Sequence, residues 1–166
     1  TLQGFALEKA VTLPAPLDST LHVVAEPQTI TLCGPTSHLN RPASCDSNQN
    51  NGSVLVGLNT QFFPQEISES ITSEVRGSIS RPATPPQFEQ EAASFEVAIR
   101  DDSINQLFWA LWYGGGLEID LAESFSEKLP TGIEHASISA TLPPVIMPGT
   151  DGNILDVGLG DIKVQA

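Results

Sequence analysis

The sequence predicts an α+β chain in which antiparallel β-structure predominates. Apolar and polar residues alternate with a period of two in many short stretches, as half-buried strands require. Thirteen Gly and thirteen Pro recur between these stretches and mark turns. A full apolar stripe at helical spacing occurs in one place, residues 104–112. We therefore expect several strands joined by turns and one short helix.

The first half of the chain predicts strands. Residues 5–13 alternate, and residues 20–32 predict one or two further strands, interrupted at Pro27 because proline cannot donate to a ladder. Residues 53–63 resume strand character. Residues 65–80 stay ambiguous, because their apolar positions have helical spacing while their Ser, Thr and β-branched residues suit an edge strand.

The two cysteines, Cys33 and Cys45, flank a loop-like segment rich in Gly, Pro and Asn. A disulfide closing this loop would remove roughly 3 kcal/mol of unfolded-chain entropy. Metal binding is the alternative, but His38 is the only further ligand type inside the loop, and a metal needs more ligands at regular spacing. We favour the disulfide, which predicts an oxidising compartment, and we expect no metal site.

A proline-rich segment divides the chain. Three prolines within five positions force extended backbone and remove donors, so residues 81–93 predict a linker. The expected organisation is a first part at 1–80, this linker, and a second part at 94–166.

Residues 94–121 contain both tryptophans and the only tyrosine of the chain. They predict strand, short helix, strand, with residues 95–99 alternating before the helix. Asp101, Asp102 and Ser103 are expected to supply capping oxygens and favourable charge at its start. The three consecutive glycines 114–116 predict its end, one of them left-handed. The apolar stripe consists of Ile104, Leu107, Phe108, Leu111 and Trp112.

This predicted helix is apolar on nearly every side. Only Asn105 and Gln106 are clearly polar within it. Such a helix has to be enclosed by its own sheet, by a partner or by lipid, because burial of apolar surface is its main source of stability.

The C-terminal segment again predicts strands. Residues 117–121 and 133–142 alternate, and the second of these carries small residues on its inner face. A Pro-Pro break and a turn at Asp151-Gly152 follow. The last strands, within 154–165, contain an irregularity at Gly160 that suggests a bulge.

Charge restricts the partners. Twenty acidic residues against seven basic ones give a formal net charge of −13. This field repels phosphate backbones and anionic membrane surfaces, so nucleic acid is not an expected partner. No apolar run reaches the 18 residues of a membrane-spanning helix, so we do not expect an integral membrane protein.

Catalytic chemistry has few candidates. The three histidines are isolated, and a lone pairing of His135 with Ser137 lacks any supporting motif. The adjacent Asp101 and Asp102 are better explained as helix-start residues than as an acid–base pair. Asp151, Asn153 and Asp156 only partly match a calcium loop, and a turn is the better interpretation. We expect neither an enzyme nor a cofactor.

The order of elements resembles the start of the second tubular domain in the family of bactericidal/permeability-increasing and lipopolysaccharide-binding proteins. The matching pieces are "PATPPQF", the strand–helix–strand segment 94–121, and "ISATLPPVIMPGTDGNILDVGLGDIKV". Together they lie within residues 82–166. Family members that bind lipopolysaccharide have a basic tip, whereas this chain is acidic. We therefore do not extend endotoxin binding from the family to this chain.

The resemblance implies a strongly twisted sheet wrapped around a helix and enclosing an apolar tube for acyl chains (a TULIP-like fold). Residues 1–80 would end a first tubular domain, and the chain would be part of a larger, secreted, periplasmic or surface protein. Lipid binding or transfer is the implied function, and a β-rich structural or protein-interaction domain is the alternative. The implied lipid contacts are Ile104, Leu107, Phe108, Leu111, Trp112, Leu117, Ile119 and Ile138.

Overall fold

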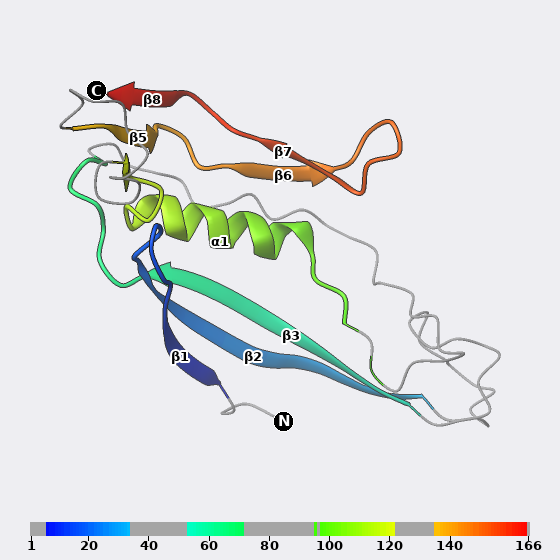
Figure 1. Ribbon diagram of the computed structural model, residues 1–166. Helices are drawn as coiled ribbons and strands as arrows, with labels where there is room; N and C mark the ends of the chain where they lie inside the picture. The colour runs from blue at the N-terminus through cyan, green and yellow to red at the C-terminus, as the bar shows by residue number, and fades with distance from the viewer. Residues whose placement is uncertain (1–5, 34–52, 72–94, 96, 122–134, 166) are drawn as a thin grey trace.

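The computed structural model describes residues 6–33, 53–71, 95, 97–121 and 135–165. These residues form one helix and eight strands, and the strands make up three antiparallel sheets. This confirms the predicted β-rich α+β class. The helix lies between two layers of strands (Figure 1). The elements are β1 (Leu7–Thr12), β2 (Thr20–Cys33), β3 (Ser53–Pro64), α1 (Asp101–Tyr113), β4 (Ile119–Asp120), β5 (Ser137–Ala140), β6 (Val145–Pro148), β7 (Leu155–Gly158) and β8 (Ile162–Gln165).

The first layer is a sheet with the strand order β1-β2-β3. The predicted strands of the first half are confirmed, but β2 continues as one strand through Pro27. The ladder to β3 shifts its register between Pro27 and Thr29, which leaves one extra residue on β2. This bulge accommodates a residue that cannot donate a ladder hydrogen bond.

One face of this sheet is mostly apolar. Residues paired directly across a ladder point to the same side, so the register fixes the members of each face. Its apolar members are Leu7 and Val11 of β1, Leu21, Val23, Ala25, Pro27, Ile30 and Leu32 of β2, and Val54, Val56, Leu58, Phe62 and Pro64 of β3. Lys9 of β1 and Thr60 of β3 are the polar residues that the register places on this face. The opposite face mixes Thr, Glu, His, Asn and Gln with fewer apolar residues.

Helix α1 begins and ends close to the predicted positions. Its N-cap is Arg100, whose side chain makes no capping hydrogen bond, so the expected N-cap within Asp101–Ser103 is wrong. The Oδ1 atom of Asp101 nevertheless accepts from the Asp102 backbone N–H at 3.0 Å. Asp101 and Asp102 occupy the first turn, where their negative charges interact favourably with the positive end of the helix dipole, as predicted. The helix ends at Tyr113 with Gly114 as its C-cap, and the next residue, Gly115, has φ +77°, which confirms the predicted left-handed glycine.

The predicted strand before the helix is wrong. Residue 95 and residues 97–100 are described without strand structure, and Phe95, Val97 and Ile99 are exposed. The alternation of side chains is present, but no described strand pairs with this segment. A strand needs the hydrogen bonds of a neighbour, and alternation alone does not provide one.

The second layer consists of two small sheets. Strands β4, β5 and β8 form one of them, with β5 in the centre, and β6 pairs with β7 in a hairpin. The hairpin turn contains Asp151 and Gly152, as predicted, and both residues have positive φ. Gly160 lies in the break between β7 and β8, where the neighbouring Asp161 has φ +41°.

The core lies where α1 rests on the first sheet. Leu21, Ala110 and Leu111 form its buried centre. The side chains packed around this centre are Leu13, Phe62, Leu107, Phe108, Trp109 and Leu117. On the opposite side of α1, the Trp112 indole N–H donates to the Ala140 carbonyl at 2.7 Å, and Ile146 is buried. Helix α1 therefore contacts both layers.

The predicted linker, residues 81–93, lies outside the described residues. The division into 1–80 and 94–166 stays a prediction. Helix α1 from the second part packs on β3 from the first part.

Candidate functional site

The predicted lipid contacts separate into three groups in the structure. Leu107, Phe108, Leu111 and Leu117 belong to the core between α1 and the first sheet. Ile104 is half-buried near the start of α1 and belongs to neither this core nor the pocket described below. Three others, Trp112, Ile119 and Ile138, line that pocket.

The aromatic residues of α1 stack along its C-terminal half. The ring centroids of Trp109 and Tyr113 lie 5.0 Å apart, and those of Trp112 and Tyr113 lie 6.3 Å apart. Both pairs are close to parallel, an arrangement that contributes about 0.5–1.5 kcal/mol per pair beyond burial. These side chains therefore stiffen the last turns of α1 and its contact with the core.

The apolar face of the first sheet extends beyond the helix that covers it. Near the core, Leu21 is only 2% exposed and Phe62 is half-buried. Farther along the same face, side chains become exposed by 47–75%. These residues, which we call the open face, are Ile30, Leu32, Val54, Val56 and Leu58.

The open face is not a scatter of single exposed residues. Ile30 pairs with Val56, and Leu32 pairs with Val54, so four β-branched or leucine side chains adjoin one another across one ladder. No charged residue belongs to the open face. A contiguous apolar patch of this kind marks an interaction surface, whereas singly exposed apolar residues need no explanation.

The open face was not predicted from the sequence. The alternation of residues 53–63 predicted β3 and its apolar side, but alternation does not tell how much of that side a short helix covers. Strand and helix lengths could have given the signal. At about 3.3 Å per residue β3 spans roughly 40 Å, while the thirteen residues of α1 span roughly 20 Å at 1.5 Å each.

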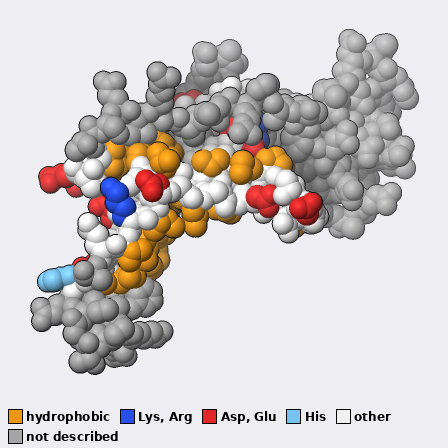
Figure 2. Space-filling view, turned by 90° about the horizontal axis from the view of Figure 1, so that it is seen from above, with side chains coloured by type: hydrophobic (Ala, Val, Ile, Leu, Met, Phe, Trp, Pro, Cys, Tyr) orange, Lys and Arg blue, Asp and Glu red, His pale blue; other side chains and the backbone are white. Residues whose placement is uncertain are grey.

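The second layer also exposes apolar side chains. Val145, Met147, Val157, Ile162 and Val164 are all more than one-third exposed. Figure 2, which looks onto the molecule from this side, shows hydrophobic side chains in rows between a few charged ones. Apolar surface is therefore exposed on both layers among the described residues.

A pocket of about 480 Å³ lies beside the sheet of β4, β5 and β8. Trp112, Ile119 and Ile138 contribute to its wall, together with Ile71 and Ala140. The other eight lining residues are polar or charged. This pocket therefore differs in character from the open face, which has only apolar side chains.

The candidate metal ligands do not cluster in the described residues. No group of three or more His, Cys, Asp or Glu side chains that could hold a metal ion occurs in this part of the chain. Cys33 ends β2, but Cys45 lies outside the described residues, so the predicted disulfide stays a prediction. Within the described ranges, no helix has the length and apolarity needed to cross a membrane.

The segment with a partial calcium pattern is a hydrogen-bonded turn. The Asp156 carboxylate accepts from the hydroxyl and the backbone N–H of Thr150, at 2.8 and 3.0 Å, and from the Asn153 side chain. The Thr150 hydroxyl is the main cause that lowers the pKa of Asp156 below its ordinary value of 3.8. Internal donors therefore occupy this carboxylate, as the interpretation of a turn predicts.

Comparisons of the chain with protein-family models, with curated proteins and with solved structures gave no match. The resemblance to the bactericidal/permeability-increasing protein family accordingly stays a prediction, and the function has to be argued from the surfaces described above.

Proposed function

We propose that this chain is a non-catalytic lipid-binding or lipid-transfer module that holds acyl chains against the open face of the first sheet. The observation that carries the proposal is the continuation of one apolar sheet face from the buried core into an exposed surface. The exposed part has the same side-chain chemistry as the buried part, so a ligand there would be enclosed on one side by a hydrophobic wall.

The physical driving force is the hydrophobic effect. Removing a methylene group from water contributes about 0.8 kcal/mol, so an acyl chain needs no polar anchor to bind well. The open face extends over five positions of β3, from Val54 to Leu58, or roughly 16 Å at about 3.3 Å per residue. This length suits an extended hydrocarbon chain lying along the strands.

The residues implied by the family resemblance take a different part in this proposal. Leu107, Phe108 and Leu111 close one end of the apolar face by packing on Leu21 and Phe62. These side chains therefore mark the end of the binding surface that lies next to the core. A TULIP-like tube, a secreted, periplasmic or surface location and a larger parent protein belong to the same proposal.

The test is uptake of a fluorescent phosphatidylcholine, a zwitterionic lipid that the acidic chain does not repel. We compare the unmodified chain with Val56→Asp, which places a charge in the centre of the open face. Thr31→Asp is the matched control, because Thr31 lies on β2 with its side chain on the opposite face of the sheet.

The expected result is saturable uptake that Val56→Asp weakens about tenfold or more, because burying an unpaired carboxylate under an acyl chain is costly. Thr31→Asp should retain the uptake. Circular dichroism confirms that both variants keep their β-structure. Absence of uptake by the unmodified chain, or equal weakening in both variants, would refute the proposal.

A protein-interaction domain is the second candidate, and one observation favours it. In the order β1-β2-β3, both outer strands have one edge unpaired by any described strand, and β3 is twelve residues long. An unpaired edge beside an apolar face is a template for adding a strand from another chain. Concentration-dependent association that Val56→Asp abolishes, in a chain that takes up no lipid, would favour this candidate.

A further inference from the structure

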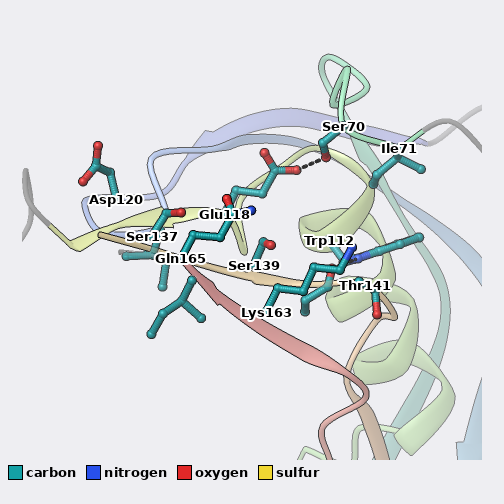
Figure 3. Close-up of a pocket in the computed structure, with 13 residues that line it drawn as sticks. Ser70, Ile71, Trp112, Glu118, Asp120, Ser137, Ser139, Thr141, Lys163 and Gln165 are labelled. Atoms are coloured by element: carbon teal, nitrogen blue, oxygen red, sulfur yellow. Dashed lines mark hydrogen bonds between the residues drawn. The ribbon is translucent and has the colours of Figure 1, made fainter. Parts of the chain in front are cut away.

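The pocket beside β4, β5 and β8 has features of a ligand site that the open face does not use. Its walls come from Ser70 and Ile71, from the segment after α1, and from β5 and β8. Figure 3 shows Glu118, Ser139, Lys163 and Gln165 arranged around one space, although they come from three separate segments. The pocket is made of residues outside the first sheet.

One carboxylate in the pocket is held in position. The Oε1 atom of Glu118 accepts hydrogen bonds from the hydroxyls of Ser68, at 2.8 Å, and Ser70. Ser68 is fixed in turn by its backbone N–H, which donates to the Tyr113 carbonyl at 2.9 Å. Oε2 makes no hydrogen bond to the described residues, so an oriented acceptor remains for a ligand.

The facing wall is one polar side of a small sheet. Ser137 pairs with Gln165, and Ser139 pairs with Lys163, so the four side chains share one face of β5 and β8. Together they present two hydroxyls, an amide and an ammonium group. The adjoining Trp112 is fixed by the hydrogen bond from its indole N–H to the Ala140 carbonyl. The donors and acceptors therefore project from paired strands, next to a buried tryptophan, and their positions are fixed by these elements.

The balance of charge selects the class of ligand. The lining carries two acids, Glu118 and Asp120, and one base, Lys163. The two acids disfavour phosphate and other anions, and Lys163 disfavours amines and other cations. An apolar ligand would leave the hydroxyls, the amide and the charges of Glu118 and Lys163 without water or partners, which is costly. A neutral ligand that both donates and accepts along its length satisfies the whole lining.

We propose that this pocket binds a neutral polyhydroxylated ligand, namely a sugar residue. Glu118 Oε2 accepts from ligand hydroxyls, while Lys163 and Gln165 donate to ligand oxygens. About 480 Å³ lies within the range of small-ligand pockets, about 300–1,000 Å³. The sugar can be free, or it can be the headgroup of a neutral glycolipid. The proposal does not depend on acyl-chain binding at the open face.

The test is a set of ¹⁵N-HSQC titrations of the unmodified chain with glucose, galactose, mannose, N-acetylglucosamine and maltose. Inorganic phosphate and choline serve as charged comparators. At least one sugar is expected to shift the amides of Ser139, Lys163 and Gln165 in a saturable manner. Vesicles of phosphatidylcholine, with and without a neutral glycolipid, separate a free sugar from a headgroup as the ligand.

Two variants test the assignment. Glu118→Gln keeps the size of the side chain but removes its charge, and it should weaken sugar binding about tenfold, as expected for losing a hydrogen bond to a charged acceptor. Glu69→Gln is the control, because Glu69 is an exposed acid between Ser68 and Ser70 that does not line the pocket. Absence of any sugar response, tighter binding of phosphate or choline, or equal weakening by both variants would overturn the proposal.

Discussion

Asn105 shows how one polar side chain can join two elements of this fold. Its side-chain amide donates to the Ile146 carbonyl at 3.0 Å, and its carbonyl accepts from the Ile146 backbone N–H at 2.6 Å. This pair of bonds has the pattern of a strand ladder, but it runs between α1 and β6. In the sequence, Asn105 is only a polar interruption of an apolar helix, and its partner is 41 residues away.

We expect Asn105→Ala to lower the free energy of unfolding by about 1–3 kcal/mol, because two backbone groups of the buried Ile146 lose their partner. Asn105→Asp keeps the acceptor but loses the donor, so its effect should be intermediate. Urea denaturation measures both. Gln106→Ala, at the next position of α1, is the control. A loss in Asn105→Ala no larger than in this control would show that the bridge does not contribute.

At the scale of elements, the end of α1 depends on glycines that let the chain come close to the first sheet. A Cβ atom added at Gly114 would lie 2.8 Å from Pro64 Cβ, and one added at Gly116 would lie 2.9 Å from Ser19 Cβ. Gly115 is restricted in two ways. Its φ of +77° is unfavourable for other residues, and a Cβ atom added there would lie 3.2 Å from Ser68 Cβ. Ser68 orients Glu118, so this turn supports both the core and the pocket.

Gly115→Ala and Gly152→Ala separate backbone strain from steric contact. Both positions have positive φ, but nothing lies within 4 Å of a Cβ added at Gly152. Gly152→Ala should therefore cost about 1 kcal/mol from backbone strain alone. Gly115→Ala should cost more, and Ser68→Gly in the same chain should recover the difference. Thermal unfolding measures these steps, and equal costs at the two positions would contradict the contact.

The sequence predicted elements better than it predicted their partners. Alternation located β1, β2, β3, β5 and β8, and the apolar stripe with its glycines located α1. The same alternation wrongly predicted a strand at residues 95–99. Alternation reports which side of a chain is apolar, whereas strand pairing depends on residues far away in the sequence. For the same reason the division into three sheets could not be predicted.

The candidate site shows the same limit. The predicted lipid contacts were mainly apolar residues of α1, and four of the eight, Leu107, Phe108, Leu111 and Leu117, lie in the core. The open face was missed because exposure depends on what covers a strand. The pocket was missed because its polar side chains come from four segments, none of which carries a motif.

At the scale of the whole molecule, α1 connects the two layers. Its core side packs on β2 and β3 through Leu111, while Asn105 and Trp112 bond to the second layer. The second layer has little buried apolar surface of its own, since Ala136, Pro144 and Ile146 are its only buried apolar residues in the sheets and turns described. Its stability should therefore depend on α1 being docked.

This dependence predicts cooperative unfolding. Leu111 is 5% exposed, so Leu111→Ala should lower the free energy of unfolding by about 2–5 kcal/mol. That is a large part of the 5–15 kcal/mol that is typical of a folded domain. Native-state hydrogen exchange should then show that the amides of β6 lose protection together with those of β2, although Leu111 belongs to the core on the first sheet.

Ile154→Ala is the control for that experiment, because Ile154 is 91% exposed in the loop before β7 and should change stability by less than about 0.5 kcal/mol. If Leu111→Ala removed protection from β2 while the Ile146 amide kept its own, the two layers would unfold separately. In that case the Asn105 bridge and the Trp112 bond would hold the second layer on a helix that no longer needs the first sheet. Loss of protection in both layers at the same free energy instead establishes α1 as the element on which the whole structure depends.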